Sequence, residues 1–499
     1  MKSKVNNANK ANEVTVFFAK QAWINGAWAQ DVLLTADASG HWHRIQPNAS
    51  EADRSGATHL SGPVLPSLVN AHSHAFQRAI VGLTERRSVG TATAGDDFWT
   101  WRDRMYSAAN RISPDQLEAI ASLLYAEMLA GGYTHVCEFH YLHNGLDGQP
   151  YATPTEMSLA LVRAAQRVGI GLTLLPTLYM RSGFTATGLR PDQQRFASTP
   201  DSIMRMVKDM QRSIQHDTAG DPCSNVVNVV NVGVALHSLR AVTPDAVQTL
   251  AEWTKVQGLP VHIHISEQVL EVTDCMAHTG QSPMDWLQSH VVLDSRWNLV
   301  HATQATPAEL QAVQAAGASV VICPATEANL GDGVFDFPSY GRANEGTKGI
   351  WSIGSDSHVT RSWPEELRLL EYSQRLTLKQ RNIAGRLGEH PSSAAALFEG
   401  ALAGGAAATG QQIGGLAAGN RADFVTLDRQ SSALLGVPND YLLDALVFSS
   451  HGGGLGATFD AVYVAGRQVV SKGQPMFNEQ GLWAKLTQKY VQAMQALWG

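Results

Sequence analysis

Apolar residues recur along the chain in eight short runs, separated by longer stretches in which apolar and polar residues alternate with helical spacing. Most of the runs are almost continuously apolar, which is typical of parallel strands that are covered on both faces. We therefore predict eight strands. They fall at residues 64–74, 135–141, 170–180, 230–239, 260–267, 297–303, 319–326 and 351–358.

The stretches between the runs carry the start and stop signals of helices. In SPDQLEAIASLLYAEMLAGG (113–132), Ser113 is a good N-cap, Pro114 suits the first turn and a glycine pair closes the end. TPDAVQTLAEWTKVQG (243–258) repeats these signals. Strands that alternate with helices predict an α/β fold, a (β/α)8 TIM-type barrel. A doubly wound open sheet would also alternate, but polar residues cluster here at the last positions of many strands, where barrels place their chemistry.

The two ends of the chain have a different pattern, because residues 13–63 and 411–475 hold short β-like runs separated by turns. Neither end is long enough to form a stable unit alone, so we expect both to pair into one small β-sandwich. Residues 482–498 have the pattern of an amphipathic helix. The predicted division is 1–63 for the N-terminal part of the sandwich, 64–410 for the barrel, 411–475 for the C-terminal part of the sandwich and 476–499 for the C-terminal helix.

The composition and net charge of the chain indicate which kinds of molecule it binds. The 499 residues are 44% hydrophobic, which is ample for a large core, and the formal net charge is −7. Because no Lys/Arg run is available to neutralise phosphates, we expect no nucleic acid and predict a small-molecule substrate. The N-terminal apolar run 14–19 is too short for a signal peptide or a membrane span, so we expect a cytoplasmic protein without a membrane partner. The four cysteines are widely scattered, and we expect free thiols.

Histidines stand at the ends of several predicted strands. His72 and His74 end the first, and residues i and i+2 of a strand share a face, as two ligands of one metal ion would. Ordinary polar residues where a strand meets its loop would give the same pair. The other strand ends offer Tyr141 (second), His237 and Arg240 (fourth), His264 and Glu267 (fifth), His301 (sixth) and Asp356 (eighth).

Histidines and an aspartate around one barrel mouth make a mixed nitrogen and oxygen site of the kind that zinc prefers. Not every histidine belongs to such a site, since a motif-like residue is often structural. The histidines that we expect to be structural, in loops or exposed to solvent are His262, His140, His143, His358 and His43.

The combination of HSH after the first strand, HxxE at the fifth, His at the sixth and SD at the eighth resembles the amidohydrolase superfamily. Within it, the chain resembles the formimidoylglutamate deiminases of bacterial histidine degradation, and this resemblance runs from residue 64 to the C-terminal β segments. The segments that carry it are AHSHAFQRAIVGLTE, FWTWRDRMY, EFHYLH, TEANLGDG and GSDSHVT. It implies zinc-dependent hydrolysis of N-formimino-L-glutamate to N-formyl-L-glutamate and ammonia.

The resemblance also implies roles for individual residues. The implied metal ligands are His72, His74, His264 and Asp356. The implied catalytic residues are Glu267, His301 and Asp356. The implied substrate contacts are Gln77, Arg102, Tyr141, His237 and Arg240. The chain departs from the family pattern in a longer N-terminal lead, a polar segment at 215–225 that looks like a surface insertion, and Ser266 in place of alanine.

We expect one zinc ion per chain. Relatives with two metals resemble one another in a carboxylated lysine at the end of the fourth strand, and here that strand ends in ALHSLR. The arginines suit a substrate with two carboxylates, although each could equally form a structural salt bridge. The alternatives are a one-zinc deaminase of a purine or other heterocycle on the same scaffold, and a catalytically inactive relative that serves in binding or assembly. Barrels of this type are often dimers, so we expect a homodimer.

Overall fold

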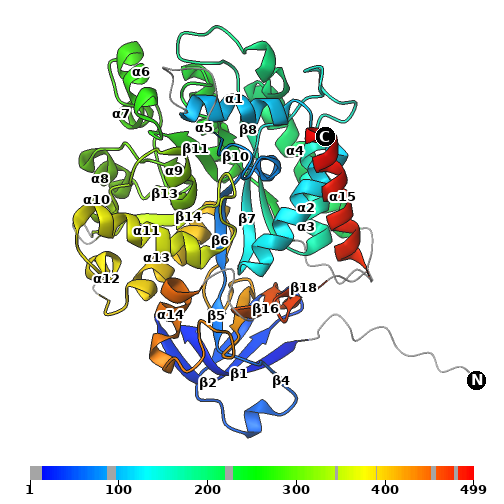
Figure 1. The fold of residues 1–499 in the computed structure, drawn as a ribbon, viewed down its shortest axis with the longest axis vertical. Helices are drawn as coiled ribbons and strands as arrows, with labels where there is room; N and C mark the ends of the chain where they lie inside the picture. The colour runs from blue at the N-terminus through cyan, green and yellow to red at the C-terminus, as the bar shows by residue number, and fades with distance from the viewer. Residues whose placement is uncertain are drawn as a thin grey trace, which may run out of the picture.

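The larger part of the molecule is a barrel of parallel strands in the order β14-β13-β12-β11-β10-β8-β7-β6, with β9 paired to β8 (Figure 1). The computed structural model describes residues 14–86, 97–219, 229–342, 347–388, 390–450, 457–476 and 481–499. A single parallel bridge between Ser73 and Asp356 joins the two edges of the sheet. The strands are β6 (Leu68–Ser73), β7 (Tyr133–His140), β8 (Gly171–Leu178), β9 (Val230–Val232), β10 (Val234–Leu236), β11 (Val261–Ile265), β12 (Trp297–His301), β13 (Ser319–Ile322) and β14 (Ile350–Ile353).

Helices follow the strands in sequence and surround the barrel (Figure 1). The major ones are α1 (Phe98–Ala109), α2 (Pro114–Ala130), α3 (Glu156–Val168), α4 (Pro200–Ala219), α5 (Pro244–Gln257), α6 (Val269–Thr279), α7 (Pro283–His290), α8 (Pro307–Ala315), α11 (Trp363–Leu378) and α13 (Ser393–Thr409). The shorter ones are α9 (Pro324–Leu330), α10 (Phe337–Gly341), α12 (Ile383–Leu387) and α14 (Leu442–Ser449). No helix in these ranges is long and apolar enough to cross a membrane.

The predicted helix signals act as expected at α2. The Ser113 hydroxyl accepts a hydrogen bond from the Gln116 backbone, and the Gln116 side chain accepts one from the Ser113 N–H (2.8 Å), which is a complete capping box. Helix α5 also begins at its predicted proline and ends at Gly258, whose φ of 66° is left-handed. Its N-cap residue Thr243 forms no capping hydrogen bond through its side chain.

A second sheet is built from both ends of the chain, and it lies at one end of the barrel (Figure 1). Its strand order is β18-β17-β16-β15-β5-β1-β2-β3, with β4 paired to β1. The predicted fold class, a barrel with a small β domain from both chain ends, is therefore confirmed. The strands are β1 (Thr15–Ile24), β2 (Ala27–Ala36), β3 (Trp42–Gln46), β4 (Thr58–His59), β5 (Val64–Pro66), β15 (Phe424–Leu427), β16 (Phe459–Val464), β17 (Arg467–Ser471) and β18 (Gln474–Pro475).

The first apolar run, 64–74, contributes to both sheets. Its beginning is β5, which pairs with β1 and β15, and its remainder is β6 of the barrel. Buried polar groups join the two parts nearby: Arg421 pairs with Asp423 and also contacts His135 Nδ1 (3.1 Å) near the start of β7. The small sheet therefore lies at the amino ends of the barrel strands, and the opposite end is free for a site.

The C-terminal helix α15 (Leu482–Trp498) lies along the outside of the barrel beside α2 (Figure 1). Trp498 Nε1 donates to the Ala79 carbonyl (3.0 Å), and Arg78 donates to the Tyr490 hydroxyl (3.0 Å). The predicted helix at 482–498 thus has the predicted bounds. The N-terminal lead, the end of the predicted insertion at 215–225 and Cys223 lie outside the described residues, whereas Cys137, Cys275 and Cys323 are free thiols.

Candidate active and metal site

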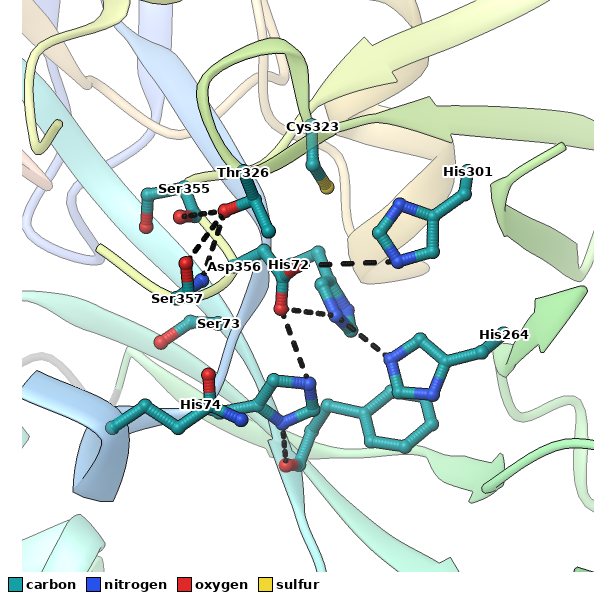
Figure 2. A network of polar contacts seen from close by, with 12 residues as sticks. His72, Ser73, His74, His264, His301, Cys323, Thr326, Ser355, Asp356 and Ser357 are labelled. Atoms are coloured by element: carbon teal, nitrogen blue, oxygen red, sulfur yellow. Dashed lines mark hydrogen bonds and ion pairs between the residues drawn. The ribbon is translucent and has the colours of Figure 1, made fainter. Parts of the chain in front are cut away.

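Three histidines and one aspartate converge at the carboxyl ends of the barrel strands (Figure 2). His72 belongs to β6, His74 follows it, His264 belongs to β11 and Asp356 follows β14. The Nε2 atoms of His72 and His264 are 3.0 Å apart, and those of His72 and His74 each lie 3.3 Å from Asp356 Oδ1. Residues far apart in the sequence thus form two overlapping groups of possible metal ligands that share His72. One is His72, His74 and Asp356, and the other is His72, His264 and His301.

The outer ring atoms of two of these histidines have fixed partners. His74 Nδ1 donates to the Phe139 carbonyl and His264 Nδ1 donates to the His237 carbonyl, each at 2.9 Å. Because the proton is on Nδ1 in both rings, each Nε2 presents a lone pair to the cluster, as in metal-binding histidines. Two imidazole nitrogens only 3.0 Å apart need a proton or a cation between them.

The charges in the cluster suit a divalent cation. Burial lowers the pKa of His72 to about 3 and also lowers the pKa values of His74 and His264, so these rings are neutral. Burial alone would raise the pKa of Asp356, but the hydrogen bond with His72 and the positive charge of His301 outweigh it and hold the pKa below its usual range. Neutral imidazoles with one carboxylate form a donor set that fits zinc.

His301, the last residue of β12, stands beside this cluster (Figure 2), and three carboxylates surround it. Its Nδ1 lies 3.2 Å from Glu327, and its Nε2 lies 3.7 Å from Glu267 and 3.9 Å from Asp356. Burial lowers the pKa of His301, but the charges of Glu267, Asp356 and Glu327 outweigh it and raise the pKa to about 10. At neutral pH His301 is therefore protonated and carries a positive charge among these carboxylates.

The backbone around the cluster is strained. Non-glycine residues with positive φ gather at the strand ends that carry the site, and such conformations cost about 1–3 kcal/mol each unless the surroundings enforce them. They are Ser266, His301, Ala302, Asp356 and His358. Strain of this kind concentrates at functional sites because it fixes side-chain direction.

Glu267 lies two residues beyond β11 and reaches the same cavity as the histidines. Burial raises the pKa of Glu267, the charges of His301 and Arg240 oppose this, and the net pKa is about 7. A carboxyl group with that pKa is partly protonated at neutral pH, which suits a residue that delivers a proton.

A cavity extends from the cluster toward the solvent. The predicted substrate contacts Gln77, Arg102, Tyr141, His237 and Arg240 all line it. Gln77 donates to the Tyr141 hydroxyl (3.2 Å). The Nε atoms of both arginines are buried and have no hydrogen-bond partner among the described residues. Two guanidinium groups, each with an unpartnered Nε atom, therefore belong to residues that line the cavity.

Some neighbours of the site were not found by sequence reasoning. Glu327, which contacts His301, lies inside the TEANLGDG segment, and Glu271 follows Glu267 by one helical turn, so both had a signal in the sequence. Trp99 stacks on both arginines, with the Arg102 and Arg240 guanidinium carbons 4.3 and 5.6 Å from its ring centroid.

Three of the histidines expected to lie outside the metal site have hydrogen-bond partners of their own. The Nε2 atom of His262 contacts the Ala408 carbonyl (2.8 Å), that of His143 the Thr177 carbonyl (2.8 Å) and that of His358 the His74 carbonyl (2.9 Å). His140 is buried and its Nε2 has no partner among the described residues, while His43 is exposed.

The barrel and its histidine–aspartate cluster define a hydrolase of the metal-dependent type, and the model of the amidohydrolase family matches residues 64–469. The chain belongs to the amidohydrolase family, whose members are generally metal-dependent. It is 44% identical to formimidoylglutamate deiminase of Pseudomonas aeruginosa over 92% of this chain and 96% of that one. The predicted resemblance is thereby confirmed, and the protein is a hydrolase that acts on carbon–nitrogen bonds.

Two further similarities concern other members of the family. The crystal structure of an amidohydrolase from Brucella melitensis superimposes with a TM-score of 0.86 at 37% identity and covers 97% of this chain and 100% of that one. The 8-oxoguanine deaminase of P. aeruginosa is 27% identical over 68% of this chain and 70% of that one.

Proposed function

We propose that this protein hydrolyses N-formimino-L-glutamate to N-formyl-L-glutamate and ammonia. The similarity to the P. aeruginosa formimidoylglutamate deiminase over nearly the whole of both chains supports this. The observation that carries the proposal is the pair of arginines, Arg102 and Arg240, whose buried Nε atoms lack acceptors beside the cavity. A substrate with two carboxylates would supply those acceptors, because guanidinium groups bind carboxylates bidentately.

We propose that one zinc ion per chain is held by His72, His74, His264 and Asp356. A bound zinc ion acts as a Lewis acid and lowers the pKa of water from about 15.7 to near 7. A single ion is supported by the end of the fourth strand, ALHSLR, which offers no lysine to bridge a second one. Metal analysis of the purified protein should find one zinc per chain, and two ions per chain would contradict the proposal.

The proposed mechanism divides two proton transfers among the side chains. Hydrolysis breaks the bond between the formimino carbon and its terminal nitrogen, the water oxygen becomes the formyl oxygen, and the nitrogen leaves as ammonia. Asp356 takes up the proton that the water loses, and His301, 3.9 Å from Asp356, orients that proton. Glu267, with a pKa of about 7, gives a proton to the departing nitrogen.

The remaining cavity residues would orient the substrate. Arg102 and Arg240 each hold one carboxylate, while Gln77, Tyr141 and His237 contact the part of the substrate between the carboxylates and the reacting carbon. Burial lowers the pKa of His237 well below its usual value, so this ring is neutral and serves as a hydrogen-bonding group.

The direct test is ammonia release from N-formimino-L-glutamate, with N-formimino-L-aspartate, guanine and adenosine derivatives as competitors. We expect the glutamate derivative to have the highest kcat/KM of this panel. The alternative function is deamination of a heterocycle. The 27% identity to 8-oxoguanine deaminase supports this alternative. Preference for guanine or an adenosine derivative would favour that alternative, and the absence of any turnover by zinc-loaded protein would favour an inactive binding relative.

We also propose that the chain forms a homodimer. Light scattering would then report twice the 53.7 kDa mass of the chain. A mass of 53.7 kDa at micromolar concentration would contradict it.

A further inference from the structure

Glu271 is a fully buried carboxylate on α6 that does not line the cavity. Its Oε1 accepts a hydrogen bond from the Ser266 N–H (3.3 Å) and its Oε2 accepts one from the Glu267 N–H (3.1 Å). A buried carboxylate needs such partners, since burying an ionised group is costly. Both donors belong to the short segment that carries the proposed proton donor, Glu267.

That segment is under backbone strain. Ser266 has a φ of 51°, in the left-handed region that non-glycine residues rarely adopt. The strained residue is held on two sides, because its N–H is bound by Glu271 and its carbonyl accepts from the Gln304 N–H (2.8 Å). This left-handed residue directly follows the end of β11, and the next residue, Glu267, lines the cavity.

Glu271 also contacts the substrate-binding region through Arg240. Arg240 Nη2 lies 3.9 Å from Glu271 and 3.9 Å from Glu267, so two carboxylates share one guanidinium group. If Glu271 lost its charge, Arg240 would pair with Glu267 alone and would stabilise the ionised form of Glu267. An ionised Glu267 has no proton to deliver.

We propose that Glu271 is a positioning residue that fixes Glu267 through the backbone and prevents Arg240 from stabilising its ionised form. This rests on the proposed function, in which Glu267 carries the proton. The direction of the electrostatic effect agrees, because the charge of Glu271 raises the pKa of Glu267 and the charge of Arg240 lowers it. The titratable and charged groups that face Glu267 are His301 at the end of β12, Arg240 after β10, Asp356 after β14, Glu271 on α6 and Asp332 after α9.

The chain offers a matched control in Glu371 of α11. Glu371 is also fully buried, accepts two successive backbone N–H groups, those of Ile383 (2.9 Å) and Ala384 (3.0 Å), and pairs with an arginine, Arg375. It does not line the cavity. Glu371→Gln therefore reproduces the structural damage of Glu271→Gln without its effect on Glu267.

The experiment measures kcat and KM for N-formimino-L-glutamate across pH in the zinc-loaded wild type, Glu271→Gln and Glu371→Gln. We expect Glu271→Gln to lower kcat by about 10-fold or more, a part of the 10²- to 10⁴-fold that proton delivery contributes. We also expect the decline of its kcat at high pH to begin at lower pH, because the pKa of Glu267 falls. Glu371→Gln should lose thermal stability to a similar extent and keep the wild-type kcat and pH profile.

Two outcomes would overturn the inference: equal kinetics in the two variants, or a lowered kcat in Glu271→Gln with an unmoved high-pH decline. If Glu271→Gln does not fold, the same pH profile is read from Ser266→Gly/Glu271→Gln against Ser266→Gly, because glycine relieves the strain at residue 266. A wild type that releases no ammonia from N-formimino-L-glutamate would instead contradict the proposed function.

Discussion

Glu267 lines the cavity and has a raised pKa. These two properties suit a proton donor, whereas the proposed ligands hold the metal ion. Glu267→Gln keeps the shape of the side chain and removes its exchangeable proton. We expect this variant to bind zinc normally and to lose about 10²- to 10⁴-fold in kcat, the usual contribution of a positioned proton donor. Zinc content and kcat measured on the same preparation test this, and loss of zinc would instead make Glu267 a ligand.

Asp356 should behave differently, because it contacts two of the histidines and also lies near His301. Asp356→Ala removes a ligand and a proton acceptor together, so we expect loss of both zinc and detectable turnover. Near-normal turnover in this variant would mean that another aspartate has this role.

Arg102 and Arg240 carry the specificity of the proposed reaction. Replacing either with Met should weaken transition-state binding by about 2–5 kcal/mol, the usual cost of leaving a buried charge without its partner. Steady-state kinetics should show most of this loss in kcat/KM for N-formimino-L-glutamate. A substrate analogue that lacks one carboxylate should distinguish poorly between the wild type and the variant that lost the matching arginine.

If both arginine variants keep the wild-type kcat/KM, the two residues are structural and the heterocycle deaminase becomes the better hypothesis. If only one variant is affected, the analogue shows which carboxylate that arginine holds.

Helix α13 packs directly against the barrel through a glycine. A methyl group on Gly404 would lie within 2 Å of the Trp351 carbonyl oxygen, which belongs to the backbone of β14. Helix propensity alone would make Gly404→Ala stabilising by about 1 kcal/mol. Because backbone cannot move aside cheaply, we expect net destabilisation of about 1–3 kcal/mol in urea unfolding.

The adjacent residue Ala403 is exposed on the same helix and supplies the control. Ala403→Gly should cost about 1 kcal/mol through helix propensity alone. A Gly404→Ala variant that is more stable than the wild type would show that α13 can shift away from β14.

Helices and strands were predictable where the spacing of apolar residues was regular. They were less predictable where one apolar run contains strands of two different sheets. All eight apolar runs contain a barrel strand, and the strand ends named the residues of the histidine cluster. Run 64–74 gave no sign that β5 and β6 belong to different sheets, because both are buried on both faces. Glu271 and Glu327 were missed because a buried carboxylate on a helix resembles a solvated one until its neighbours are known.

Stability of the whole molecule should depend on pH through Glu138, which is buried behind the HSH segment and accepts hydrogen bonds from Ser73, Ala75 and Tyr125. Burial raises the pKa of Glu138 from 4.5 to about 8. Between these values the folded state binds a proton that the unfolded state releases, so stability falls as pH rises from about 4.5 to about 8.

Glu138→Gln removes this titration. The melting temperature of the variant should therefore rise relative to that of the wild type as pH increases from 5 to 8. Thermal unfolding at several pH values measures the difference, and a constant offset across this range would contradict the assignment.

Metal removal should also weaken the whole barrel, because the proposed ligands come from β6, β11 and the end of β14. A ligand at one hundred times its dissociation constant stabilises the folded state by about 2.7 kcal/mol. We expect a chelator to lower the melting temperature and added zinc to restore it. Asp356→Ala is the control, and its melting temperature should respond to neither treatment.

The seam closed by the Ser73–Asp356 bridge has a consequence for synthesis of the chain. Strand β6 leaves the ribosome early, but its partner across the seam and the fourth proposed ligand are not made until residue 356 has emerged. The small sheet is completed later still, because β5 pairs with β15, which lies near the other end of the chain. A chain cut short before residue 356 would carry three of the four proposed ligands on an open sheet, so assembly of the metal site reports that translation of the barrel is complete.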